Sequence, residues 1–153
     1  MNYHFPPTPR SLLLPAFLLL LLLALPLHAQ TAAEVQTLLE SPVVSCGQGA
    51  FFVLDGEASS WIAFEQVREN GWLPANAVFG DPLTLGAASF LIMRALDMKG
   101  GIMYTVFPGP RTAFHDLVRL SIIQGRIDPA GKINGWEFLH ILDRALNAAG
   151  EGE

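Results

Sequence analysis

The chain has 153 residues, enough for one ordinary domain, and carries a net charge of −5. It contains no run of Lys or Arg, so its composition gives no indication of nucleic-acid binding. Its single cysteine, Cys46, excludes an internal disulfide. We interpret Cys46 as a small core residue, with an intermolecular disulfide as the alternative.

Residues 1–29 have the features of a secretory signal peptide. Arg10 precedes a nearly continuous apolar run from residue 11 to residue 25, and Ala29 offers a small residue for cleavage. The alternative is an uncleaved membrane anchor, but the run is short for the ~20 apolar residues of a spanning helix and contains Pro15. We therefore expect an exported product in the periplasm or at the cell surface, with no transmembrane segment after cleavage.

The mature chain begins with a predicted pair of helices within residues 31–57. Thr31 is expected to cap the first helix, which Ser41-Pro42 ends. Ser45 is expected to cap the second helix. The apolar run at residues 51–54 is also compatible with a strand, but alignment with a later part of the chain favours a helix.

A second pair of helices is predicted within residues 60–97. Its first helix is expected to stop at Asn70-Gly71. Thr84 is expected to cap the second, which runs to about Leu96 and is apolar almost all round. A helix that is apolar on every side lies in the interior of a domain, so we expect this one to be the most buried element.

The third pair of helices is predicted within residues 111–148. It follows an apolar segment, residues 102–107, that we interpret as a linker or a short strand. Asn134 is expected to cap the last helix, with Glu137 reaching back from the first turn. Residues 149–153 are expected to form a frayed tail.

Two of these helix pairs share a sequence pattern. Both contain an Asp-Pro turn, at residues 81–82 and 128–129, and both end in Arg-Ala-Leu, at 94–96 and 144–146. A fainter copy of the second helix is present at residues 45–54. Repeats of this kind each leave an apolar face that one helix pair cannot bury alone.

The sequence therefore predicts an all-α domain over residues 30–148. In this prediction, three helix-loop-helix repeats pack as a pseudo-threefold bundle. The repeats comprise residues of about 31–57, 60–97 and 111–148.

This pattern resembles the S-layer homology (SLH) domain. Repeats of that family have an Asp-Pro-type turn, a Thr that caps the second helix, and an apolar helix that ends near Arg-Ala-Leu, as residues 63–96 and 113–146 do here. The resemblance implies a three-repeat helical bundle that binds cell-wall polymers and anchors envelope proteins to peptidoglycan or its attached glycans. The binding signature of the family is a Thr-Arg-Ala-Glu-like tetrad at the start of the second helix. None of the corresponding tetrads here, which begin at Ser45, Thr84 and Asn134, has the arginine, and Glu137 alone keeps the acid.

Candidate ligand contacts lie at equivalent positions of the repeats. Arg94 and Arg144 are such a pair, and we weigh a ligand-gripping role for them against an ordinary surface ion pair. A tryptophan such as Trp136 can stack on a sugar ring, although burial is the commoner fate of an aromatic side chain. The full candidate set is Thr84, Arg94, Asn134, Trp136, Glu137 and Arg144.

Catalytic and metal-binding constellations are not evident, so we predict no enzyme activity, no metal and no cofactor. Glu137 and His140 have the spacing of a carboxylate metal site, but such sites need further ligands. A degenerate calcium loop before Glu137 has Arg126 in place of its first acidic ligand. His115 and Asp116 are adjacent on a helix and do not face each other.

We therefore expect a non-enzymatic cell-envelope module that binds peptidoglycan or an attached cell-wall polymer. The alternative is a small periplasmic adaptor that uses the same fold to bind another envelope protein. The missing arginine favours this alternative, because the arginine fork is what grips carboxylate or phosphate with two hydrogen bonds.

Overall fold

The computed structural model describes residues 32–54, 56, 59–126 and 128–150. The predicted signal peptide, the predicted cap Thr31 and residues 151–153 lie outside the described residues. The chain divides into two units, residues 1–36 and 37–153. Of the first unit the structure describes residues 32–36, which belong to a helix over residues 32–40.

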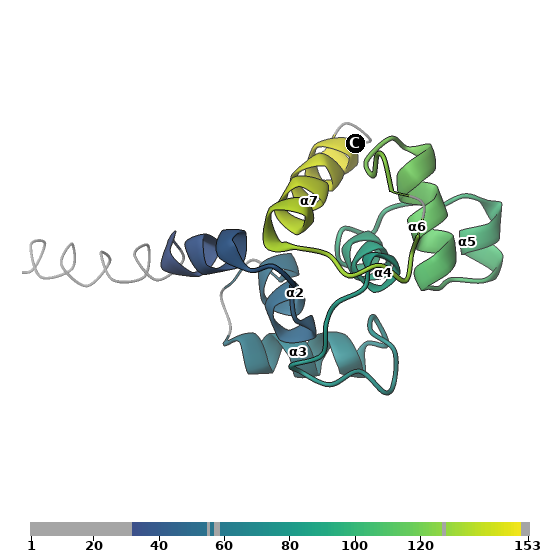
Figure 1. The fold of residues 1–153 in the computed structure, drawn as a ribbon. Coiled ribbons are helices and arrows are strands. Elements are labelled where there is room, and N and C mark those ends of the chain that lie inside the picture. Colours follow the sequence, from purple (N-terminus) through teal and green to yellow (C-terminus); the bar gives the residue numbers. More distant parts are fainter. Residues whose placement is uncertain (1–31, 55, 57–58, 127, 151–153) are drawn as a thin grey trace, which may run out of the picture. The chain divides into compact units, whose positions relative to one another are not determined.

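The described residues form helices, and the pairing of extended backbone among them is limited to isolated bridges. The predicted all-α class is therefore confirmed. No helix within these described ranges is long and apolar enough to cross a membrane. The labelled helices are α2 (Cys46–Val53), α3 (Ser60–Glu69), α4 (Leu85–Ala95), α5 (Ile102–Val106), α6 (Pro110–Arg119) and α7 (Gly135–Gly150) (Figure 1).

Three expectations about individual segments can be compared with these bounds. Phe51, Phe52 and Val53 belong to α2, so the helix predicted there is confirmed. The linker or short strand predicted at residues 102–107 is wrong, because residues 102–106 form helix α5. Six residues are too few to separate a helical period from a strand period when most of them are apolar. Helix α7 extends to Gly150, into the segment expected to fray.

Side-chain caps begin three of the helices as predicted. The Ser45 hydroxyl accepts from the Gln48 amide at 3.2 Å, the Thr84 hydroxyl from the Ala87 amide at 3.2 Å, and the Asn134 side-chain oxygen from the Glu137 amide at 2.8 Å. Each cap satisfies an amide that has no partner within the helix. The residue types chosen from the sequence therefore fix where α2, α4 and α7 begin.

The residue before each of these caps takes part in a closed ring of backbone hydrogen bonds. The Val44 amide donates to the Ile133 carbonyl at 2.9 Å, the Ile133 amide donates to the Leu83 carbonyl at 3.3 Å, and the Leu83 amide donates to the Val44 carbonyl at 2.8 Å. All three side chains are fully buried. Buried backbone groups must find partners, and here three segments that are distant in sequence satisfy one another.

Helix α4 lies at the centre of the unit formed by residues 37–153. It packs against α2, α6 and α7 (Figure 1). Every residue from Leu85 to Met93 is buried. The prediction that this helix would be the most buried element, made because it is apolar on all sides, is confirmed. Its position brings the starts of α2 and α7 close to its own start.

Candidate functional site

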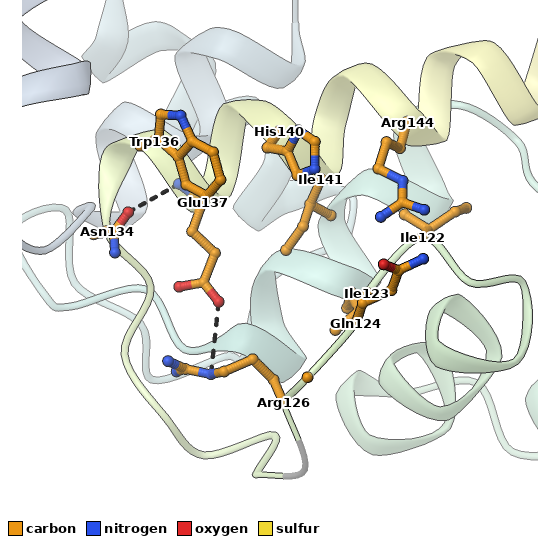
Figure 2. Close-up of a pocket in the computed structure, with 11 residues that line it drawn as sticks. Ile122, Ile123, Gln124, Arg126, Asn134, Trp136, Glu137, His140, Ile141 and Arg144 are labelled. Carbon is orange, nitrogen blue, oxygen red and sulfur yellow. Dashed lines mark hydrogen bonds and ion pairs between the residues drawn. The ribbon is translucent and has the colours of Figure 1, made fainter.

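A groove of about 410 Å³ lies along the first turns of α7, on the side that faces the segment following α6. Figure 2 shows its lining side chains, which come from two parts of the chain. One part is the exit from α6 and the loop after it, and the other is one face of α7. The lining residues are Ile122, Ile123, Gln124, Gly125, Arg126, Asn134, Trp136, Glu137, His140, Ile141 and Arg144.

One end of the groove is built around an ion pair between the loop and α7. Arg126 Nε lies 3.6 Å from Glu137 Oε1 (Figure 2), and the Arg126 guanidinium also donates to the Lys132 carbonyl at 3.0 Å. The Arg126 side chain is 40% exposed and that of Glu137 is 17% exposed. A pair this accessible contributes little to stability, but it fixes a guanidinium beside open space.

Two aromatic rings of α7 also line the groove. The Trp136 and His140 rings stack with centroids 5.2 Å apart and planes inclined by 14° (Figure 2). They stack because residues four apart on a helix lie on neighbouring turns of one face. Trp136 is 62% exposed, so most of its ring surface is open to solvent. Burial, the commoner fate of an aromatic side chain, does not apply to this tryptophan.

Arg144 supplies a second guanidinium at the other end of the groove. It lies two turns beyond Glu137 on the same helix, and Figure 2 shows its head group pointing toward Gln124. Within the described ranges it forms no ion pair. The groove therefore has a cation at each end, and the exposed Trp136 ring, stacked on His140, lies at the end near the Arg126–Glu137 pair.

Four of the six candidate ligand contacts meet in this groove: Asn134, Trp136, Glu137 and Arg144. Thr84 and Arg94 do not line it. Thr84 is engaged as the cap of α4. The Arg94 guanidinium lies 5.3 Å from the centre of the Phe90 ring, in a cation–π contact at an exposed position. The surface ion pair considered for Arg94 and Arg144 is not formed with any acid that the structure describes.

Sequence reasoning missed Gln124 and Arg126 as lining residues. In the sequence, Arg126 was considered only because it replaces the first acidic ligand of a degenerate calcium loop. The repeat pattern offered no signal for it, because the equivalent position in the preceding repeat is Asn76. Which residues of a loop reach a neighbouring helix depends on how the loop folds back, and this is decided by tertiary contacts.

The groove does not have the features of a metal centre. No group of three His, Cys, Asp or Glu side chains converges among the residues that the structure describes. Glu137 is paired with Arg126, and His140 is stacked on Trp136. The guanidinium of Arg126 is bonded inside the segment considered as a degenerate calcium loop, where its charge opposes a divalent cation.

Comparison of the chain with protein-family models, with curated proteins and with solved structures gave no match. The resemblance to SLH domains therefore rests on the short motifs of the sequence.

Proposed function

We propose that the chain is an exported, non-enzymatic module of the cell envelope that resembles an SLH domain and binds a cell-wall polymer in the groove along α7. In this proposal three helix-loop-helix repeats are arranged with pseudo-threefold symmetry, and residues 1–29 direct export to the periplasm or the cell surface.

The ring of hydrogen bonds through Val44, Leu83 and Ile133 supports the threefold arrangement. Each residue immediately precedes a helix cap, so each proposed repeat contributes the same position to the ring. A cyclic pattern, in which every member donates once and accepts once, is what three related units around one axis would give. An arrangement without symmetry would have no reason to use the same position three times.

A second set of backbone hydrogen bonds also closes a cycle through the three proposed repeats, with donors and acceptors in the opposite order to the first ring. The first helical amide of each second helix donates to the turn of the next repeat: Cys46 to the Asp81 carbonyl at 2.9 Å, Leu85 to Gly131 at 2.8 Å, and Gly135 to Ser41 at 3.0 Å. These amides have no partner within their own helices. Their satisfaction by a neighbouring repeat supports an interlocked trio.

The exposed Trp136 ring, stacked on His140 in a groove that Arg126 and Arg144 also line, is the observation that carries the functional proposal. The face of an indole ring packs well against the apolar face of a sugar. A guanidinium grips a carboxylate or phosphate through two hydrogen bonds. The groove thus combines the two kinds of contact that an acidic polysaccharide requires. Arg126 would supply the arginine that the tetrad beginning at Asn134 lacks.

The second candidate is a small envelope adaptor that binds another protein. It is favoured by a separate apolar surface around the start of α3. Trp61, Ile62 and Val78 are 56%, 57% and 60% exposed there, and the Trp61 ring packs on Phe79 with centroids 5.3 Å apart. Exposed aromatic and aliphatic side chains of this kind are frequent at the centres of protein interfaces.

The direct test is retention of the purified protein on peptidoglycan sacculi, with and without the acidic polymers attached to them. We expect retention on sacculi that carry the acidic groups and release by salt, since the contact includes charge. Retention no better than that of an unrelated helical protein would contradict polymer binding. Cross-linking in intact envelopes distinguishes the adaptor, which would co-purify with one partner protein in fixed proportion.

A further inference from the structure

Helix α5 and the residues on either side of it present a dense group of exposed apolar side chains. Ile102 is 82% exposed, Met103 64%, Val106 59% and Phe107 66%. Ile102, Met103 and Val106 occupy positions i, i+1 and i+4 of α5, which lie on one face of the helix, and Phe107 follows directly at its C-terminal end. We call these four side chains the α5 face.

The folded domain holds the α5 face outward. Tyr104, on the opposite side of the turn, is buried and packs on Phe90 with ring centroids 6.1 Å apart. The buried carboxylate of Asp116 accepts from the Gly101 amide at 2.7 Å, just before the helix. The Thr112 hydroxyl donates to the Phe107 carbonyl at 2.9 Å, just after it. The segment is therefore anchored at both ends and in the middle, and its apolar side chains cannot turn inward without breaking these contacts.

Charge is distributed unevenly around this face. Residues 94–119 contain four of the nine Lys and Arg residues of the chain and two of its fourteen Asp and Glu residues, a net charge of +2 in a chain whose net charge is −5. No acid lies between Asp97 and Asp116, whereas Lys99 and Arg111 flank α5 on either side and are exposed. Asp116 is itself buried and paired with Arg119.

We propose that the α5 face inserts into the interfacial region of an anionic lipid bilayer, with Lys99 and Arg111 at the level of the headgroups. Shallow insertion of a few apolar side chains together with nearby basic residues combines the two signals that stable peripheral anchoring needs. The area argues for lipid over protein, because one helical turn is small against the ~800 Å² per partner that a stable protein interface buries. The charge argues against a second copy of the chain, since two basic surfaces would face each other. This inference is independent of polymer binding, which uses α7.

A fluorescent probe at one residue tests insertion directly. The full chain carries Met103→Cys in a Cys46→Ala background, labelled with an environment-sensitive nitrobenzoxadiazole group. It is mixed with vesicles of phosphatidylcholine containing about one third phosphatidylglycerol, or none. The matched control carries the label at Val78→Cys, which has similar exposure in a loop outside the α5 face. Because the signal comes from the labelled residue alone, lipid binding by the predicted leader does not imitate it.

We expect a blue shift and a rise in emission for the label at residue 103 with anionic vesicles, and no change for the label at residue 78. The effect should be lost at high salt, where headgroup attraction is screened. Unchanged emission at residue 103 with anionic vesicles would overturn the proposal. So would an increase that depends on protein concentration in the absence of vesicles, because it would assign the face to self-association.

Two variants complete the test. Ile102→Asp with Phe107→Asp should weaken vesicle binding at least about tenfold, because each apolar group lost from the interface lowers the partition coefficient. Both side chains are exposed, so the helical circular dichroism of the protein should be unchanged. Lys99→Glu with Arg111→Glu should weaken binding to anionic vesicles by a similar factor. Binding that is unaffected by both double variants would refute the proposal.

Discussion

Gly71 and Ser121 terminate α3 and α6 with the same left-handed backbone, at φ +68° and +59°. The hydrogen bonds around them also match. The Gly71 amide donates to Arg68 and the following amide, of Trp72, to Val67, and the corresponding bonds run from Ser121 to Val118 and from Ile122 to Leu117. Glycine adopts this conformation without penalty, whereas a residue with a Cβ is strained there. The turn at Ser121 is therefore strained by its left-handed backbone, whereas the turn at Gly71 is not.

We predict that Ser121→Gly stabilises the protein. Relief of the left-handed strain, less the added flexibility of the unfolded chain, should raise the free energy of unfolding by about 0.5–1 kcal/mol. Urea denaturation followed by circular dichroism measures this change. Ser121→Ala, which keeps the Cβ, should give no such gain, and Gly71→Ser should destabilise by a similar amount. A Ser121→Gly protein that is no more stable than the parent would contradict the argument.

Gly135 begins α7 against the backbone of residues 38 and 39. A Cβ at this position would overlap the Leu38 carbonyl, which belongs to main chain and cannot rotate away. We expect Gly135→Ala to lower the free energy of unfolding by about 3 kcal/mol or more, beyond the usual cost of overpacking. The matched control is Gly150→Ala at the other end of the helix, where nothing lies within 4 Å. Equal thermal melting of the two variants would show that the close approach is not required.

Arg144 and Arg94 each begin an Arg-Ala-Leu segment, in α7 and α4, but Arg144 alone of the two lines the groove. If polymer binds there, Arg144→Ala should reduce retention on sacculi about tenfold, since a hydrogen bond between charged groups is lost. Arg94→Ala should leave retention unchanged, although it loses the contact with the Phe90 ring. Equal losses in both variants would indicate a general effect of charge and exclude a specific site.

Trp136 and Trp61 provide a second matched pair, with similar exposure of 62% and 56% on different helices. Trp136→Ala should reduce sacculus retention about tenfold if the ring stacks on sugar. Trp61→Ala should not, and its effect would instead appear in any partner captured by cross-linking. Quenching of tryptophan fluorescence by added polymer, lost in Trp136→Ala and kept in Trp61→Ala, gives an independent measurement. The reverse pattern would favour the adaptor function.

Cys46 should make stability depend on pH in the alkaline range. Burial, and next the negative charge of Asp81, raise the pKa of this thiol above its usual 9.0. The folded protein then keeps the proton at a pH where the unfolded chain has released it. Stability is complete below about pH 9 and falls as the pH rises further. Burial also raises the pKa of Tyr104 above 10.0, which acts in the same direction.

The free energy of unfolding, measured by denaturant titration across this pH range, checks the prediction. Cys46→Ala should show a shallower decline than the parent between about pH 8.5 and pH 10, because the slope follows the difference in bound protons. The decline that remains belongs to Tyr104 and other groups. Identical slopes for the two proteins would mean that the thiol does not contribute.

Local features were predictable from the sequence because their causes lie within a few residues. Ser45, Thr84 and Asn134 cap helices since their short polar side chains reach an amide three residues ahead. The burial of α4 followed from an apolar sequence on every side of the helix. Local patterns in the sequence identified only some of the residues that line the groove. The predicted set included Asn134, Trp136 and Glu137, because they belong to the tetrad at the start of the last helix, and Arg144, because it matches Arg94 in the sequence pattern. It missed Arg126 and Gln124 on the facing loop.

The sequence by itself determined where α2, α4 and α7 begin, which helix lies at the centre, and that the described chain is helical, since caps and apolar periodicity act over one or two turns. Only the tertiary structure decided the ring through Val44, Leu83 and Ile133, the pairing of Arg126 with Glu137, and the outward α5 face. Each of these depends on groups that are far apart along the chain. Their partners are chosen by the way three segments fold around α4, which no local pattern of residues encodes.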